Sequence, residues 1–118
     1  MAEEADRTLD RLLDLDGVVL VISADGMYWV KFAVRRVPVS ASKPHGLDYS
    51  LTLHGPNNKR LVGFDNDHPV PPTKWGEPQD HRHARGSSKP YAYSDAAALL
   101  TAFWTDVDSV LRERGVVR

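Results

Sequence analysis

The sequence predicts an α+β fold, in which an antiparallel β-meander of four to five strands packs against a long C-terminal helix. Three observations support this class. Residues 18–65 hold apolar runs of strand length separated by turn residues, and residues 94–114 carry one long apolar stripe at helical spacing. A shorter stripe at the N-terminus predicts a short helix there. The chain has 118 residues, 42% of them hydrophobic, which is the size of a single domain.

Residues 1–16 are expected to form the N-terminal helix. Ala5, Leu9, Leu12 and Leu13 share one helical stripe, and the Asp16-Gly17 pair is typical of a helix end.

The meander is expected over residues 17–93. Residues 18–23 read VVLVIS and are followed by an Asp-Gly pair that favours a hairpin turn. Residues 27–37 alternate so that Tyr28, Phe32 and Val34 share one face. The clearest alternation lies in residues 47–54, LDYSLTLH, which predicts one buried and one polar face.

Residues 59–65 predict the fourth strand of the meander, and residues 90–93 are the candidate for a fifth. Between them, the proline-rich and histidine-rich segment 66–89 is expected to be a long loop. A loop of that length in a compact domain is often functional.

The C-terminal helix is expected over residues 94–115. Ser94 is the N-cap candidate, Asp95 favours the first turn, and Gly115 favours the end. The stripe that should face the sheet comprises Ala97, Leu100, Phe103, Trp104, Val107, Val110 and Leu111.

Composition narrows the class of protein. The chain has no cysteine, which excludes disulfides and thiolate metal sites, and it has no apolar run long enough to cross a bilayer. Its acidic, polar N-terminus does not resemble a signal peptide, so a cytoplasmic protein is expected. Residues 31–93 hold ten basic and five acidic residues and all five histidines. This basic centre suits an anionic ligand such as nucleic acid, and uneven surface charge is the alternative reading.

The histidines of the long loop favour acid–base chemistry. His68, His81 and His83 can exchange protons near neutral pH. Cleavage of RNA needs a base for the 2′-hydroxyl, an acid for the leaving oxygen and a cation for the developing charge. Arg82 and Arg85 could supply the cation, and Asp65 or Asn66 could orient a histidine.

Two other readings of the loop stay open. In an extended segment His81 and His83 point the same way, and Asp65 and His68 could complete a nitrogen-and-oxygen ligand set for zinc or manganese. Alternatively, the histidines are ordinary polar loop residues and the Asp-Asn pair only ends a strand. Arg36, at a strand end, could bind phosphate or pair with a carboxylate.

Four sequence elements, in this order, resemble the TumE family of toxins from toxin–antitoxin systems. Residues 36–53 read RVPVSASKPHGLDYSLTL, residues 61–69 read LVGFDNDHP, residues 81–83 read HRH, and PYAYSD precedes an apolar helix. The resemblance spans residues 18–110. The positions that carry it are Arg36, Pro44, His45, Gly46, Tyr49, Asp65, Asn66, His68, His81 and His83.

The resemblance implies a small cytoplasmic toxin that acts on RNA or translation and is paired with a helix-turn-helix antitoxin. We expect an endoribonuclease that needs neither metal nor cofactor. His68, His81 and His83 are the expected proton-transfer residues. Asp65 would orient a histidine, and Arg36 would hold phosphate in the catalytic set. The expected substrate-binding residues are Arg82, Arg85, His45, Asn66 and Tyr49.

The topology adds one geometric expectation. The loops that join strands two to three and four to five emerge at the same end of a meander, so His45 should lie near His81. Two other functions remain open: a non-catalytic module that binds RNA or the antitoxin, and a metal-dependent hydrolase with a His/Asp site.

Overall fold

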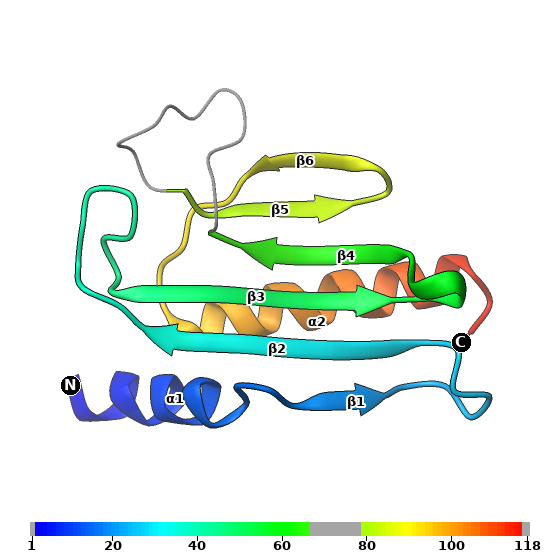
Figure 1. The fold of residues 1–118 in the computed structure, drawn as a ribbon, viewed down its shortest axis with the longest axis horizontal. Helices are drawn as coiled ribbons and strands as arrows, with labels where there is room; N and C mark the ends of the chain where they lie inside the picture. The colour runs from blue at the N-terminus through cyan, green and yellow to red at the C-terminus, as the bar shows by residue number, and fades with distance from the viewer. Residues whose placement is uncertain (1, 67–78, 117–118) are drawn as a thin grey trace.

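The computed structural model describes residues 2–66 and 79–116. Six antiparallel strands form one sheet in sequence order, and a long helix covers one face of it (Figure 1). The elements in chain order are α1 (Ala2–Asp14), β1 (Val19–Val21), β2 (Trp29–Arg36), β3 (Leu47–His54), a 3₁₀ turn (Pro56–Asn58), β4 (Arg60–Asp65), β5 (His81–Ala84), β6 (Ser87–Pro90) and α2 (Ala96–Glu113). The predicted α+β class is confirmed, with six strands where four to five were expected.

The additional pairing comes from the β5–β6 hairpin, which lies, except for Pro90, inside the segment 66–89 predicted to be a loop. Ala84 pairs with Ser87, so Arg85 and Gly86 form a two-residue turn, and both have positive φ values, 52° and 78°. The candidate fifth strand at residues 90–93 is wrong, because only Pro90 of that segment lies in a strand. Residues 81–84 read HRHA and show no apolar alternation. Pairing with β4 makes them a strand.

The core lies between the sheet and α2, and alternation along the strands supplies it as predicted. Val30, Phe32 and Val34 of β2 are buried. Phe32 meets Phe103 of α2 edge to face, with ring centroids 5.8 Å apart. Burying each such side chain stabilises the fold by about 1.5–3 kcal/mol. The other fully buried strand and helix residues include Leu47, Tyr49, Leu51, Leu53, Val62, Phe64, Leu99 and Leu111.

Helix α2 begins one residue later than the N-cap candidate Ser94 implied. The cap is Asp95, whose Oδ1 accepts a hydrogen bond of 2.8 Å from the backbone N–H of Ala98. Such a cap contributes about 1 kcal/mol. The carboxylate also lies at the positive end of the helix dipole.

The sheet face opposite α2 is polar, and its rows run across several strands. One row joins Ala33, Ser50, Asp65 and His81, because each residue pairs with the next across the sheet. At the other end of this open face, His54 stacks on Trp29 with ring centroids 4.2 Å apart. Histidines and carboxylates are therefore gathered on the face that α2 does not cover.

In the part of the chain that the structure describes, neither helix has the length and apolar character needed to span a membrane.

Candidate functional site

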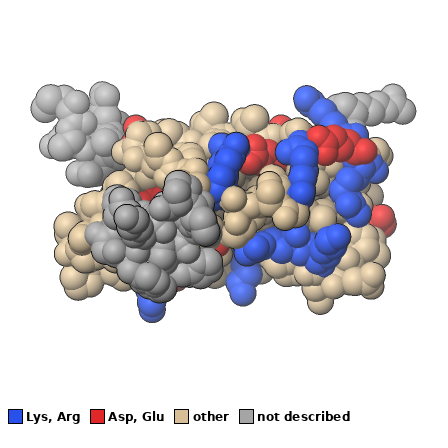
Figure 2. Space-filling view, turned by 90° about the horizontal axis from the view of Figure 1, so that it is seen from above, with Lys and Arg blue, Asp and Glu red and all other residues tan. Residues whose placement is uncertain are grey.

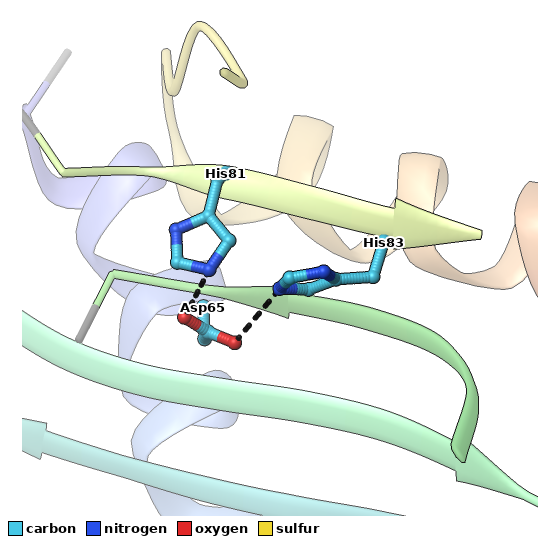
Figure 3. A group of neighbouring side chains, drawn as sticks. All are labelled: Asp65, His81 and His83. Carbon is cyan, nitrogen blue, oxygen red and sulfur yellow. Dashed lines mark ion pairs between the residues drawn. The ribbon is translucent and has the colours of Figure 1, made fainter. Parts of the chain in front are cut away.

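Asp65, His81 and His83 form one cluster on the sheet face opposite α2 (Figure 3). Asp65 ends β4 and pairs directly with His81 of β5, and His83 follows two residues later on the same face. The Nε2 atom of His81 lies 2.7 Å from Oδ1 of Asp65. The Nε2 atom of His83 lies 3.7 Å from Oδ2 of the same carboxylate. One carboxylate therefore faces two imidazoles, one through each oxygen.

The hydrogen-bonding environment of His81 fixes the role of each ring nitrogen. Its Nδ1 lies 2.9 Å from the backbone carbonyl oxygen of Gln79, which can only accept. Its Nε2 faces the Asp65 carboxylate. Nδ1 is therefore the donor to the Gln79 carbonyl, and Nε2 is the atom that His81 presents to Asp65.

Burial separates the roles of the two histidines. His81 is fully buried and Asp65 is 5% exposed, whereas the side chain of His83 is 17% exposed. His83 also lines a cavity of about 150 Å³ together with Arg60, Leu61 and Ser88. The cluster thus presents one imidazole toward a cavity and keeps its other two members inside the protein.

Gly63 lets a cation lie beside His83. It pairs with His83 across the sheet. A Cβ atom at this position would lie 3.3 Å from Cδ of Arg60 and 3.5 Å from Cδ2 of His83. Within residues 2–66 and 79–116, Arg60 forms no ion pair. We did not single out Arg60 from the sequence, although a glycine inside the predicted strand RLVGFD is a signal of close approach over the backbone.

A second polar cluster lies at the same end of the sheet but on the helix side. The Tyr49 hydroxyl donates a hydrogen bond of 2.7 Å to Oδ2 of buried Asp80. Nε2 of His45 lies 3.4 Å from Oδ1 of Asp80, and the His45 ring packs on Tyr93 with centroids 4.0 Å apart. Burial, followed by the charge of Asp80, raises the pKa of Tyr49 above its ordinary value. Because Asp80 precedes His81, His45 lies at the expected end of the sheet.

Asn66 extends the sheet beyond β4. Its side-chain oxygen accepts from the backbone N–H of Tyr49 at 3.0 Å, and its amide group donates to the carbonyl oxygen of Leu47 at 2.7 Å. Its own carbonyl oxygen contacts the Lys43 ammonium. Fully buried Asn66 therefore holds the segment that follows Asp65 against β3.

The predicted arginines lie outside the cluster. Arg82 points to the helix side, where its Nη2 lies 2.6 Å from Oδ2 of Asp106 and its guanidinium covers the Phe64 ring. Arg85 donates to Glu113 of α2, with Nε 3.0 Å from Oε1. Exposed Arg36 lies 3.8 Å from Asp10. Seen from the β6 edge, several basic side chains lie beside acidic ones (Figure 2).

The structure thus brings together Asp65, His81 and His83, and joins His45 to Tyr49 through Asp80 in a separate cluster. His68, also predicted to transfer protons, lies outside the described residues.

Comparison with known protein families decides the identity of the chain. The family model described as Toxin TumE matches residues 7–111. The chain belongs to the TumE toxin family. The resemblance found in the sequence is therefore confirmed, and both polar clusters of this TumE-family toxin lie inside the matched region. Comparisons with curated proteins and with solved structures gave no match. Membership in a toxin family implies an antitoxin partner.

Proposed function

We propose that this TumE-family toxin is an RNA-targeting endoribonuclease that works by histidine acid–base chemistry without a metal. The observation that supports the proposal is the carboxylate of Asp65, which faces fully buried His81 through one oxygen and the partly exposed His83 through the other. A carboxylate beside an imidazole orients the ring and stabilises the imidazolium that forms when the ring takes a proton. The reacting group in this proposal is His83.

In the proposed reaction, His83 takes the proton of a ribose 2′-hydroxyl. The 2′-oxygen attacks the adjacent phosphorus, the bond to the 5′-oxygen breaks, and that oxygen leaves with a proton from a second donor. The products are a 2′,3′-cyclic phosphate and a 5′-hydroxyl end. We propose His68 as the second donor, on the basis of the sequence. Arg60, beside His83, would neutralise the charge that develops on the phosphate.

His81 is a positioning residue in this proposal. It is fully buried, and its hydrogen bond with Gln79 fixes the ring against the backbone. Its Nε2 keeps the Asp65 carboxylate in place for His83. Arg36, Arg82, Arg85, His45, Asn66 and Tyr49 stay predictions as catalytic or substrate contacts.

The biological setting proposed here follows from the family. The toxin would act in the cytoplasm, and its antitoxin would be a helix-turn-helix protein that neutralises it.

A metal-dependent hydrolase is the second candidate, and one observation favours it. Ligand atoms of Asp65, His81 and His83 all lie within 4.8 Å of one another. His81 donates from Nδ1 to a backbone carbonyl in its neutral form, which is how metal-binding histidines are commonly held. One carboxylate and two imidazoles suit zinc or manganese. Titration of EDTA-treated protein with Zn²⁺ or Mn²⁺, followed by calorimetry and by thermal melting, tests this candidate without an activity assay.

The experiment that tests the proposed function is cleavage of mixed cellular RNA by the purified toxin, with and without EDTA. The wild type is compared with His83→Gln and with His54→Gln, a matched histidine change on the same sheet face. Cleavage that survives EDTA, leaves cyclic phosphate ends and is lost only in His83→Gln supports the proposal. Cleavage that EDTA abolishes and Mn²⁺ or Zn²⁺ restores contradicts it in favour of the metal enzyme. RNA binding without cleavage contradicts both and indicates a binding module.

A further inference from the structure

Strand β1 leaves an apolar edge of the sheet uncovered. It is the first strand of the sheet, and among residues 2–66 and 79–116 its one partner strand is β2 (Figure 1). Its residues Val19, Leu20 and Val21 are 52%, 42% and 63% exposed. Met27, in the turn to β2, is also exposed. A soluble domain gains nothing in stability from apolar side chains that stay in water, so the composition of β1 needs another explanation.

The opposite edge of the same sheet is built differently. Strand β6 reads SSKP, and all four of its residues are exposed. Lysine and proline on an edge strand discourage pairing with another chain, because the charge repels and proline has no N–H to donate. β1 has neither of these protections. The β6 edge is therefore protected against pairing with another chain, whereas the β1 edge can accept a further strand.

The backbone of β1 presents hydrogen-bonding groups on this edge. The N–H of Phe32 donates to Val18, and the N–H of Ile22 donates to Tyr28. In an antiparallel pair, residues whose N–H and C=O groups bond the neighbouring strand alternate with residues whose N–H and C=O groups point away from it. The N–H and C=O groups of Val19 and Val21 therefore point away from β2. An added strand could pair with these groups and cover the three apolar side chains.

Charge defines the partner strand. Exposed Asp16 and Asp25 flank β1, and the Asp16 carboxylate also accepts a hydrogen bond of 2.9 Å from the N–H of Val34. Hydrogen bonds from the Ser23 hydroxyl and then from the Met27 N–H lower the pKa of Asp25. Antiparallel pairing of β1 with β1 of a second copy, centred on Leu20, would place Asp16 of one copy opposite Ala24 of the other and diagonal to its Asp25. Like charges so placed disfavour a homodimer, and a strand with basic flanks fits instead.

We propose that the antitoxin of this toxin docks on β1 by adding a strand with an apolar, β-branched centre and lysine or arginine at its ends. β-strand addition of this kind draws affinity from main-chain hydrogen bonds and specificity from alternate side chains. The surface lies at the edge of the sheet opposite β5 and β6, so this inference does not depend on whether the toxin cleaves RNA.

The test measures binding of the cognate antitoxin to the full-length toxin and to the variant Val19→Lys/Val21→Lys. Both positions are exposed, so the variant should keep the melting temperature of the wild type. We expect its affinity for the antitoxin to fall by about 100-fold or more, because two lysines meet a basic strand. The control is Thr101→Lys/Thr105→Lys, which adds the same charge on the exposed face of α2 and should bind like the wild type.

Amide hydrogen exchange gives a second readout that does not rely on substitution. We expect the amides of Val19 and Val21 to exchange rapidly in the toxin alone and at least about tenfold more slowly in the complex. Unchanged exchange at both amides in the saturated complex, or wild-type affinity of the β1 lysine variant, would overturn the proposal. Self-association of the toxin alone that the β1 variant abolishes would also overturn it, in favour of a second copy as the occupant.

Discussion

Nε2 of His81 lies 2.7 Å from Oδ1 of Asp65, inside the protein and directly across the β4–β5 ladder. The other oxygen of the same carboxylate faces His83, which is the more exposed histidine. A single buried acid thus links an imidazole held by the backbone with an imidazole that lines a cavity. This relationship gives Asp65 a larger expected effect on activity than any other described carboxylate.

Asp65→Asn should reduce RNA cleavage by about 100-fold or more, because the amide holds the shape of the carboxylate but cannot stabilise an imidazolium. The substitution should also lower the free energy of unfolding by about 1–3 kcal/mol, since Asp65 is buried with its partners. Initial cleavage rates at saturating RNA and urea unfolding measure the two effects separately.

The control for that variant is Asp48→Asn on the same face. Asp48 pairs with exposed Arg35 at 3.0 Å, so its loss should cost less than about 1 kcal/mol and leave cleavage unchanged. Equal loss of cleavage in both variants would show that removing either carboxylate from this face lowers activity, which would contradict a specific role of Asp65.

Gly63→Val should impair cleavage while the fold persists. The new side chain would occupy the space in which Arg60 and His83 lie side by side, 3.3 Å and 3.5 Å from the nearest atoms of each. Valine suits a strand, but Gly63 is buried and the added methyl groups crowd Arg60 and His83, so the free energy of unfolding should fall by about 1–3 kcal/mol. We expect kcat/KM for RNA to fall about tenfold or more. Wild-type kinetics in a folded Gly63→Val protein would remove Arg60 from the proposed site.

Arg82→Ala should act through stability. The substitution leaves Asp106 without its partner and uncovers Phe64, which should cost about 1–3 kcal/mol. Arg85→Ala removes a pair that is half exposed on both sides, so it should lower the melting temperature less than Arg82→Ala does. Thermal melting compares the two. A specific loss of RNA cleavage by folded Arg82→Ala would instead support the substrate role predicted from the sequence.

Alkaline pH should weaken the fold through the tyrosines around Asp80. Burial, followed by the charge of Asp80, raises the pKa of Tyr93 to about 12. The folded protein then binds the phenolic proton more tightly than the unfolded chain, whose phenols ionise near pH 10. This contribution is fully present below pH 10 and is lost as the pH rises from 10 toward 12.

Urea unfolding between pH 9 and pH 12 measures that loss. Tyr93→Phe should show a shallower decline in this range than the wild type, by less than about 1.4 kcal/mol per pH unit because Tyr93 is partly solvated. Parallel declines in the two proteins would contradict the assignment to Tyr93.

The parts of the fold that the sequence predicted are those with a strong local pattern. The alternation LDYSLTLH matches β3 in its bounds and, apart from buried Thr52, in its burial, because one of its faces packs on α2 and the other is polar. In contrast, β5 reads HRHA, and its strand depends on pairing with β4 and on partners for each charge. Single-sequence patterns contain no information on such long-range partners, so the hairpin was read as a loop.

The candidate site also has features that the sequence predicts and features that it does not. The spacing of His81 and His83 predicted that they share a face, and the meander order predicted that His45 lies at their end of the sheet. The partner of each cation could not be predicted, because Asp106 and Glu113 reach Arg82 and Arg85 only through the packing of α2. Arg60 was not predicted as a site residue, because its position beside His83 depends on the absence of a Cβ atom at Gly63.

The most direct test of the central claim is rescue of His83→Ala by imidazole. Cleavage of RNA by the purified variant is measured in EDTA as the imidazole concentration rises, beside the wild type and His54→Ala. If His83 exchanges the proton, the variant should be inactive alone and should gain activity in proportion to added imidazole, while the other two proteins do not respond. Full activity of folded His83→Ala without imidazole would contradict the account.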